Sequence, residues 1–171
     1  SMRKQKGFSL IELLIVVAII LIIAAIAIPN LLRARIAANE SSAVGSTRTV
    51  NTAEVAYNSA YPTVGFAITL NSLAGTCTGS TVPTSTSACL IDNVLGASNA
   101  TTKSGYSFGL DNGGSAATGG APQGSYSIDA QPVTVNQTGV RYFCSAADGV
   151  VRYGSSAFTG TGCQTNGTPL Q

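Results

Sequence analysis

The chain has 171 residues, four cysteines and a formal net charge of +2. Its length is sufficient for one domain with a core plus an appended helix. Its basic character is local, because Arg3, Lys4 and Lys6 precede Gly7 and the remaining chain holds six basic against seven acidic side chains. No basic stripe with interleaved aromatic residues remains, so the composition excludes a strong nucleic-acid interface.

A long apolar run follows the basic leader. The segment 8–28 has 21 residues, and only Ser9 and Glu12 are not apolar. This length matches the ~20 residues with which an α-helix crosses a bilayer, and the basic leader predicts a cytoplasmic N-terminus. A charged side chain at bilayer depth costs roughly 2.5 to 3.5 kcal/mol or more, so Glu12 is a functional-site candidate that needs a partner.

The helical pattern continues beyond the apolar run. Apolar and aromatic residues recur at helical spacing up to Tyr61, and Pro62 then ends the helix. A single helix over 8–61 would be ~80 Å long, so we expect its first half to project from a domain of this size. Pro29 lacks a backbone donor and predicts a kink or a melted turn near 26–30.

The remainder, 62–171, is rich in Gly, Ser and Thr and poor in charge, with clustered apolar residues that indicate a folded domain. We expect a loop-like segment over 63–104, with one helical turn near 90–95, and an exposed loop over 112–124. Partial alternation of apolar and polar residues predicts four strands, at 106–110, 125–130, 140–145 and 150–153. The predicted fold class is α+β, with the long helix packed on a four-stranded antiparallel sheet.

All four cysteines lie in this second part, at Cys77, Cys89, Cys144 and Cys163. An even number of cysteines downstream of a membrane signal is typical of disulfides in an oxidising compartment, and four allow three connectivities. We favour Cys77 with Cys89 and Cys144 with Cys163, because each pair closes a local loop. The alternative is buried free thiols.

No catalytic set is evident. The chain has no His, and the acids of the second part, Asp92, Asp111, Asp129 and Asp148, are dispersed along it. We interpret each as a turn or strand-end residue. Neither a calcium loop nor a phosphate-binding loop is present, so we expect neither an enzyme nor a cofactor.

The junction between Gly7 and Phe8 carries the functional hypothesis. Cleavage there would create an ammonium at Phe8, four residues before Glu12 and on the same helix face. The two charges could neutralise one another within one chain or between neighbouring subunits, and the second arrangement would fix the axial offset of stacked helices. The alternative is a simple signal anchor whose Glu12 lies near the lipid headgroups.

The stretch from Gly7 to Pro29 closely resembles the N-terminal signature of type IV pilins and of type II secretion pseudopilins. Gly7, Phe8, Glu12 and Pro29 all fall at that family's spacing, whereas Leu21 stands where many members have Gly. The resemblance implies cleavage after Gly7 and N-methylation of Phe8 by a prepilin peptidase. It also implies extraction from the inner membrane into a helical filament in which Glu12 pairs with the Phe8 amine of an adjacent subunit.

From this resemblance we expect a leader at 1–7, a long helix at 8–61 whose transmembrane and assembly half is 8–29, and a globular head at 62–171. The implied function is a structural subunit, a major pilin, of a type IV pilus that supports adhesion and twitching motility. Its implied partners are identical subunits, the prepilin peptidase, the pilus assembly machinery and, before assembly, the inner membrane; the filament would lie on the cell surface. A pseudopilin and a monomeric membrane-anchored binding domain remain the alternatives.

Overall fold

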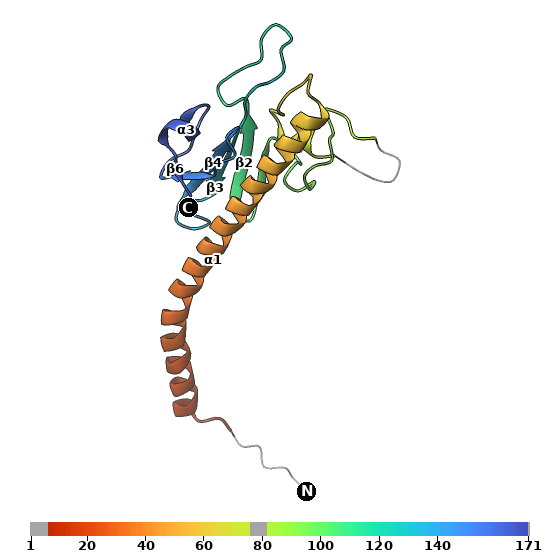
Figure 1. The fold of residues 1–171 in the computed structure, drawn as a ribbon. Coiled ribbons are helices and arrows are strands. Elements are labelled where there is room, and N and C mark those ends of the chain that lie inside the picture. The colour runs from red at the N-terminus through yellow and green to blue at the C-terminus, as the bar shows by residue number, and fades with distance from the viewer. Residues whose placement is uncertain (1–6, 76–81, 171) are drawn as a thin grey trace. The chain divides into compact units, whose positions relative to one another are not determined.

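A computed structural model describes residues 7–75 and 82–170, so most of the leader and Cys77 lie outside the described residues. The chain divides into two compact units between Arg35 and Ile36. The fold is α+β, as predicted: a long N-terminal helix, whose second half packs on an antiparallel sheet (Figure 1).

The long helix, α1, spans Leu10–Ala60, close to the predicted 8–61. Its last hydrogen bonds include one from the Tyr61 N–H to the Tyr57 carbonyl at 2.8 Å. The next residue, Pro62, has no N–H to donate, so the helix ends there. Helical conformation continues through Pro29, and the melted turn considered for 26–30 is therefore absent from this described segment. One missing backbone bond does not break a helix that continues for several turns on both sides.

The sheet has six antiparallel strands in the order β1-β2-β3-β4-β5-β6, a simple meander. The four predicted strands correspond to β2 to β5, and the predicted count was too low because two short strands join the edges. The bounds are β1 Ala100–Lys103, β2 Tyr106–Asp111, β3 Ser127–Pro132, β4 Tyr142–Ala146, β5 Arg152–Gly154 and β6 Thr168–Pro169.

Two short helices complete the second unit: α2, Leu70–Leu73, and α3, Gly162–Asn166. The segment expected to be loop-like, 63–104, thus contains both α2 and β1. At the predicted helical turn near 90–95, the chain forms a turn in which the Gly96 N–H donates to the Asp92 carbonyl at 3.0 Å. The segment is not part of a helix.

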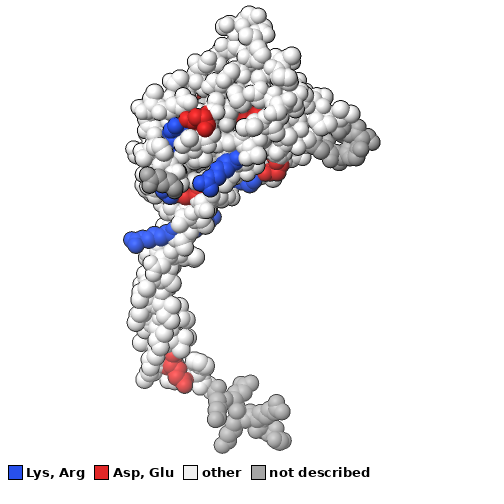
Figure 2. Space-filling model, in the orientation of Figure 1, with Lys and Arg blue, Asp and Glu red and all other residues white. Residues whose placement is uncertain are grey.

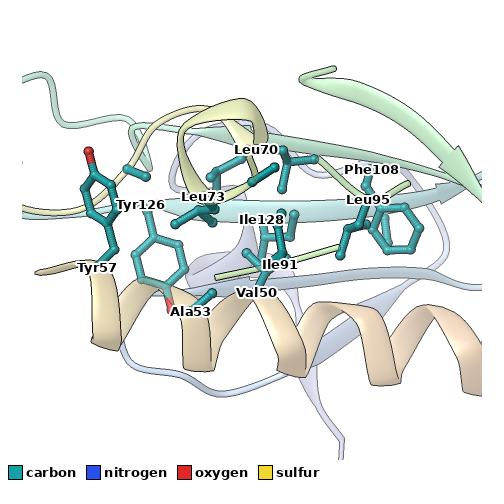
Figure 3. Close-up of a cluster of buried hydrophobic side chains, with 14 of the residues drawn as sticks. Val50, Ala53, Tyr57, Leu70, Leu73, Ile91, Leu95, Phe108, Tyr126 and Ile128 are labelled. Carbon is teal, nitrogen blue, oxygen red and sulfur yellow. The ribbon is translucent and has the colours of Figure 1, made fainter. Parts of the chain in front are cut away.

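The core lies between one face of α1 and the sheet (Figure 3). In β2 the side chains of Tyr106, Phe108 and Leu110 are buried and alternate with half-buried residues, as expected for a sheet with one covered face. The buried positions of α1 recur every three or four residues: Glu40, Ala43, Ser46, Thr47, Val50, Asn51, Ala53, Glu54 and Tyr57. Several of these are polar and so need partners in the sheet or the loops.

One predicted disulfide is present between Cys144 of β4 and Cys163 of α3, with an S–S distance of 2.08 Å. It fastens α3 to the sheet. Cys89 is also disulfide-bonded. Its predicted partner, Cys77, lies outside the described residues.

Glu40 joins α1 to the chain entering β4. Its carboxylate accepts the backbone N–H groups of Val140 at 3.0 Å and Arg141 at 3.1 Å, and the Arg141 Nε at 2.8 Å. Burial by itself raises the pKa of Glu40, but the hydrogen bonds from Val140 and Arg141 outweigh it and hold the pKa below its usual value. The charged carboxylate is therefore the stabilising form, and its contribution is lost in acid.

Glu54 has the opposite electrostatic setting. Its side chain is fully buried, one carboxyl oxygen accepts the Ala67 N–H at 2.9 Å, and Oε1 lacks a hydrogen-bond partner among the described protein atoms. Burial raises its pKa to about 8, against a weaker opposing effect of the Ala67 bond. The proton therefore stays on Glu54 at neutral pH in the folded chain, while the unfolded chain releases it.

Replacing Glu40 with Ala should destabilise the second unit by about 3 kcal/mol, because it leaves two backbone N–H groups and a guanidinium without their acceptor. Chemical unfolding of the detergent-solubilised chain would measure this. Lys103→Ala is the matched control, since the Lys103–Asp92 ion pair is exposed and should contribute less than about 1 kcal/mol. Equal losses in the two variants would contradict the role given to Glu40.

The buried Glu54 should make stability fall as the pH rises. Between the unfolded pKa near 4.5 and the folded pKa of about 8, unfolding releases a proton, so stability declines with pH and then levels off. Between pH 6 and 8 the decline should be about 2 kcal/mol.

Glu54→Gln should flatten that slope. Asp129, whose pKa burial and the charge of Asp111 raise to about 6, acts in the same direction, mainly below pH 7. The difference between the denaturant midpoints of the wild type and the variant from pH 6 to 8 therefore isolates Glu54. Parallel pH profiles for the wild type and the variant would contradict the assignment.

Candidate functional site

The candidate site begins where α1 begins. Ser9 precedes the helix, and its carbonyl accepts the Leu13 N–H at 3.2 Å. Glu12 is the third helical residue, and its Oε2 accepts the Ser9 backbone N–H at 2.9 Å. This is the carboxylate half of a capping box, in which an acid in the first turn reaches back to an otherwise unpaired N–H.

The capping contact was not predicted, although its signal is in the sequence. Ser9 and Glu12 stand at the Ser-x-x-Glu spacing typical of a helix start. The partner predicted for Glu12 was the Phe8 nitrogen. The Ser9 N–H takes up Oε2, and a carboxylate can accept from several donors at once, so Glu12 keeps capacity for a further partner.

Gly7 and Phe8 lie in irregular chain immediately before α1, and both are exposed. A Cβ built at Gly7 would meet nothing within 4 Å, and its φ is outside the left-handed region. Neither space nor backbone conformation therefore requires glycine at this position.

The apolar side chains of the first unit are solvent-exposed along the whole helix. The exposed fraction is 80% at Phe8, 63% at Leu21 and still 72% at Leu31. Within the described residues, α1 is the helix that is long and apolar enough to cross a membrane. Such a continuous apolar surface is typical of a segment that lipid or other protein covers.

Pro29 belongs to the same helix but does not lie at its N-terminal end. It follows Glu12 by 17 residues, or about 25 Å along the helix axis. The structure thus brings Gly7, Phe8 and Glu12 to one helix end and leaves Pro29 far from them.

The acids of the second unit have local roles. Asp92 binds Lys103 at 2.9 Å and accepts the Leu95 N–H, and Asp148 pairs with Arg152 at 2.6 Å. In the part of the chain that the structure describes, no group of three acidic or cysteine side chains could hold a metal ion. Few charged side chains interrupt the visible surface (Figure 2).

Comparison with known proteins bears on the first unit. Residues 2–28 match the family model described as the prokaryotic N-terminal methylation motif. This is the segment that holds Gly7, Phe8 and Glu12. The N-terminal segment of the chain therefore carries the methylation motif that is typical of type IV pilins.

The chain is also similar to a curated protein, the type IV wide pilus major component PilA4 of Thermus thermophilus. The two are 68% identical over 40 residues, which cover 23% of this chain and 30% of that protein. The match therefore spans less than a third of either protein. No solved structure matches the chain.

Proposed function

We propose that the chain is a structural subunit, a major pilin, of a type IV pilus, and that it polymerises with identical copies through α1. The observation that carries the proposal is the exposed apolar helix with a single carboxylate in its first turn, directly after Gly7 and Phe8. The matched methylation motif and the 68% identity to a pilus major component over 40 residues support it.

In this proposal a prepilin peptidase cleaves after Gly7 and methylates the new Phe8 amine. A peptidase must take an extended backbone into its active site, and an exposed, irregular Gly7–Phe8 segment offers one. The absence of any steric need for glycine at position 7 supports a requirement imposed by another protein rather than by the fold.

The subunit is first held in the inner membrane by the apolar half of α1, and the assembly machinery then transfers it to the filament on the cell surface. In the filament, neighbouring helices replace lipid around the same side chains. Glu12 accepts the Phe8 ammonium of an adjacent subunit while its Ser9 bond keeps the carboxylate in place. Charge pairing in an apolar environment thus sets the axial register.

Replacing Glu12 with Ala should leave insertion and cleavage intact but strongly reduce filament yield. An unpaired charge in an apolar environment costs roughly 2.5 to 3.5 kcal/mol, or about a hundredfold for each subunit added. Electron microscopy and immunoblotting of sheared surface material would measure the yield. Glu12→Asp is the informative control, because it keeps the charge on a shorter side chain and should retain part of the assembly; normal yield from Glu12→Ala would exclude the register role.

Replacing Gly7 with Val should block processing without altering the fold, because a side chain has open space there. Intact-mass measurement on membranes should show a precursor that keeps its leader, whereas the wild type should begin at methylated Phe8. Mature Gly7→Val protein would place the cleavage site elsewhere. Fibres seen only in cells that have a type II secretion system would identify a pseudopilin instead.

A further inference from the structure

Where β2 ends, two consecutive side chains form hydrogen bonds with the backbone that follows them. β2 ends at Asp111, and the chain then turns through Gly113 and Gly114, whose φ angles are 61° and 76°. Asp111 Oδ1 accepts the Gly113 N–H at 2.7 Å, and Asn112 Oδ1 accepts the Gly114 N–H at 3.1 Å. The second of these bonds directs the side-chain oxygen of Asn112 forward along the chain.

An asparagine followed by glycine can react with its own backbone. The nitrogen of the next residue attacks the side-chain Cγ and forms a cyclic imide, most readily where that residue has no side chain. The reaction needs a base for the attacking N–H and a donor that stabilises the developing oxyanion. Here the Asp111 carboxylate accepts a hydrogen bond from the Gly113 N–H, and the Gly114 N–H donates one to Asn112 Oδ1.

We propose that Asn112 is a self-modifying site at which Asp111 acts as general base, Gly113 supplies the nucleophile and the Gly114 N–H stabilises the oxyanion. The Gly113 nitrogen forms a bond to Asn112 Cγ and its proton passes to Asp111. The proton then moves to Asn112 Nδ2, the Cγ–Nδ2 bond breaks and ammonia leaves. Water opens the resulting imide, leaving aspartate or isoaspartate at position 112.

A second Asn-Gly pair, Asn166-Gly167, provides a comparison within the same chain. There the Gly167 N–H donates to the Cys163 carbonyl at 3.1 Å, at the end of α3. A peptide carbonyl is not a base, and the disulfide at Cys163 holds this helix on β4. The second Asn-Gly pair thus has the same sequence without the catalytic arrangement.

Modification would alter the loop in two ways. A new carboxylate would lie beside Asp111, which already raises the pKa of Asp129. Isoaspartate would also lengthen the backbone where Gln123 Nε2 binds the Asn112 carbonyl at 3.3 Å and the Ser125 carbonyl at 2.7 Å. The reaction therefore adds a negative charge and a longer backbone at the start of an exposed loop, and it needs no other enzyme.

The test follows both asparagines in the full, folded chain in detergent at neutral pH. Tandem mass spectrometry of tryptic peptides separates the two sites, because Arg141 and Arg152 lie between them. We expect conversion at Asn112 to be at least tenfold faster than at Asn166, and faster in the folded than in the urea-unfolded chain. A rate at Asn112 no higher in the folded chain would overturn the proposal.

Asp111→Asn tests the base, because it keeps an oxygen acceptor for the Gly113 N–H but removes the carboxylate. General bases contribute about a hundredfold or more, so conversion at Asn112 should slow by at least tenfold while the rate at Asn166 stays constant. Circular dichroism verifies that the variant is folded. An unchanged rate at Asn112 would exclude Asp111 as the base.

Discussion

The apolar surface of the first unit is unfavourable in water, and the rest of the structure depends on this constraint. Each large aliphatic side chain gains roughly 1.5 to 3 kcal/mol when it is removed from water, and those between Leu10 and Leu31 are exposed in the isolated chain. An exposed apolar surface of this extent is typical of a helix that lipid or other protein covers. Glu12 matters because it is the one charged residue between Leu10 and Leu31, so whatever covers this surface must accommodate its carboxylate.

The second half of α1 has a different role, because it packs on the sheet of the second unit. Apart from Val50 and Tyr57, its buried residues are small or polar, and each polar group needs a partner at a fixed position. Asn51 donates to Ser145 Oγ at 2.8 Å and accepts from the Tyr126 hydroxyl at 3.1 Å, while Glu40 holds the chain entering β4. These bonds define one position of the helix along the sheet, which apolar contacts alone would leave less well specified.

Much of this was predictable, because the decisive signals are local. The apolar run, Pro62 and the alternation in β2 each act within a few residues, and they predicted α1 and the four central strands. The edge strands β1 and β6 were missed since Ala100–Lys103 and Thr168–Pro169 are short, polar and stabilised only by pairing. The partners of Glu40 and Asn51 lie about a hundred residues away, so no local pattern could indicate them. The Ser9–Glu12 contact was local and could have been found.

The disulfide between Cys144 and Cys163 limits how far the chain can extend under tension. Strand β5 lies inside the loop that the disulfide closes, and the two cysteines are 19 positions apart in the sequence. A pulled chain could otherwise lengthen by up to about 60 Å as these residues straighten. The covalent link removes that extension, so tension passes from β4 to the C-terminal segment without unravelling β5. In the filament proposed above, a subunit under tension would therefore keep β5 paired within its head.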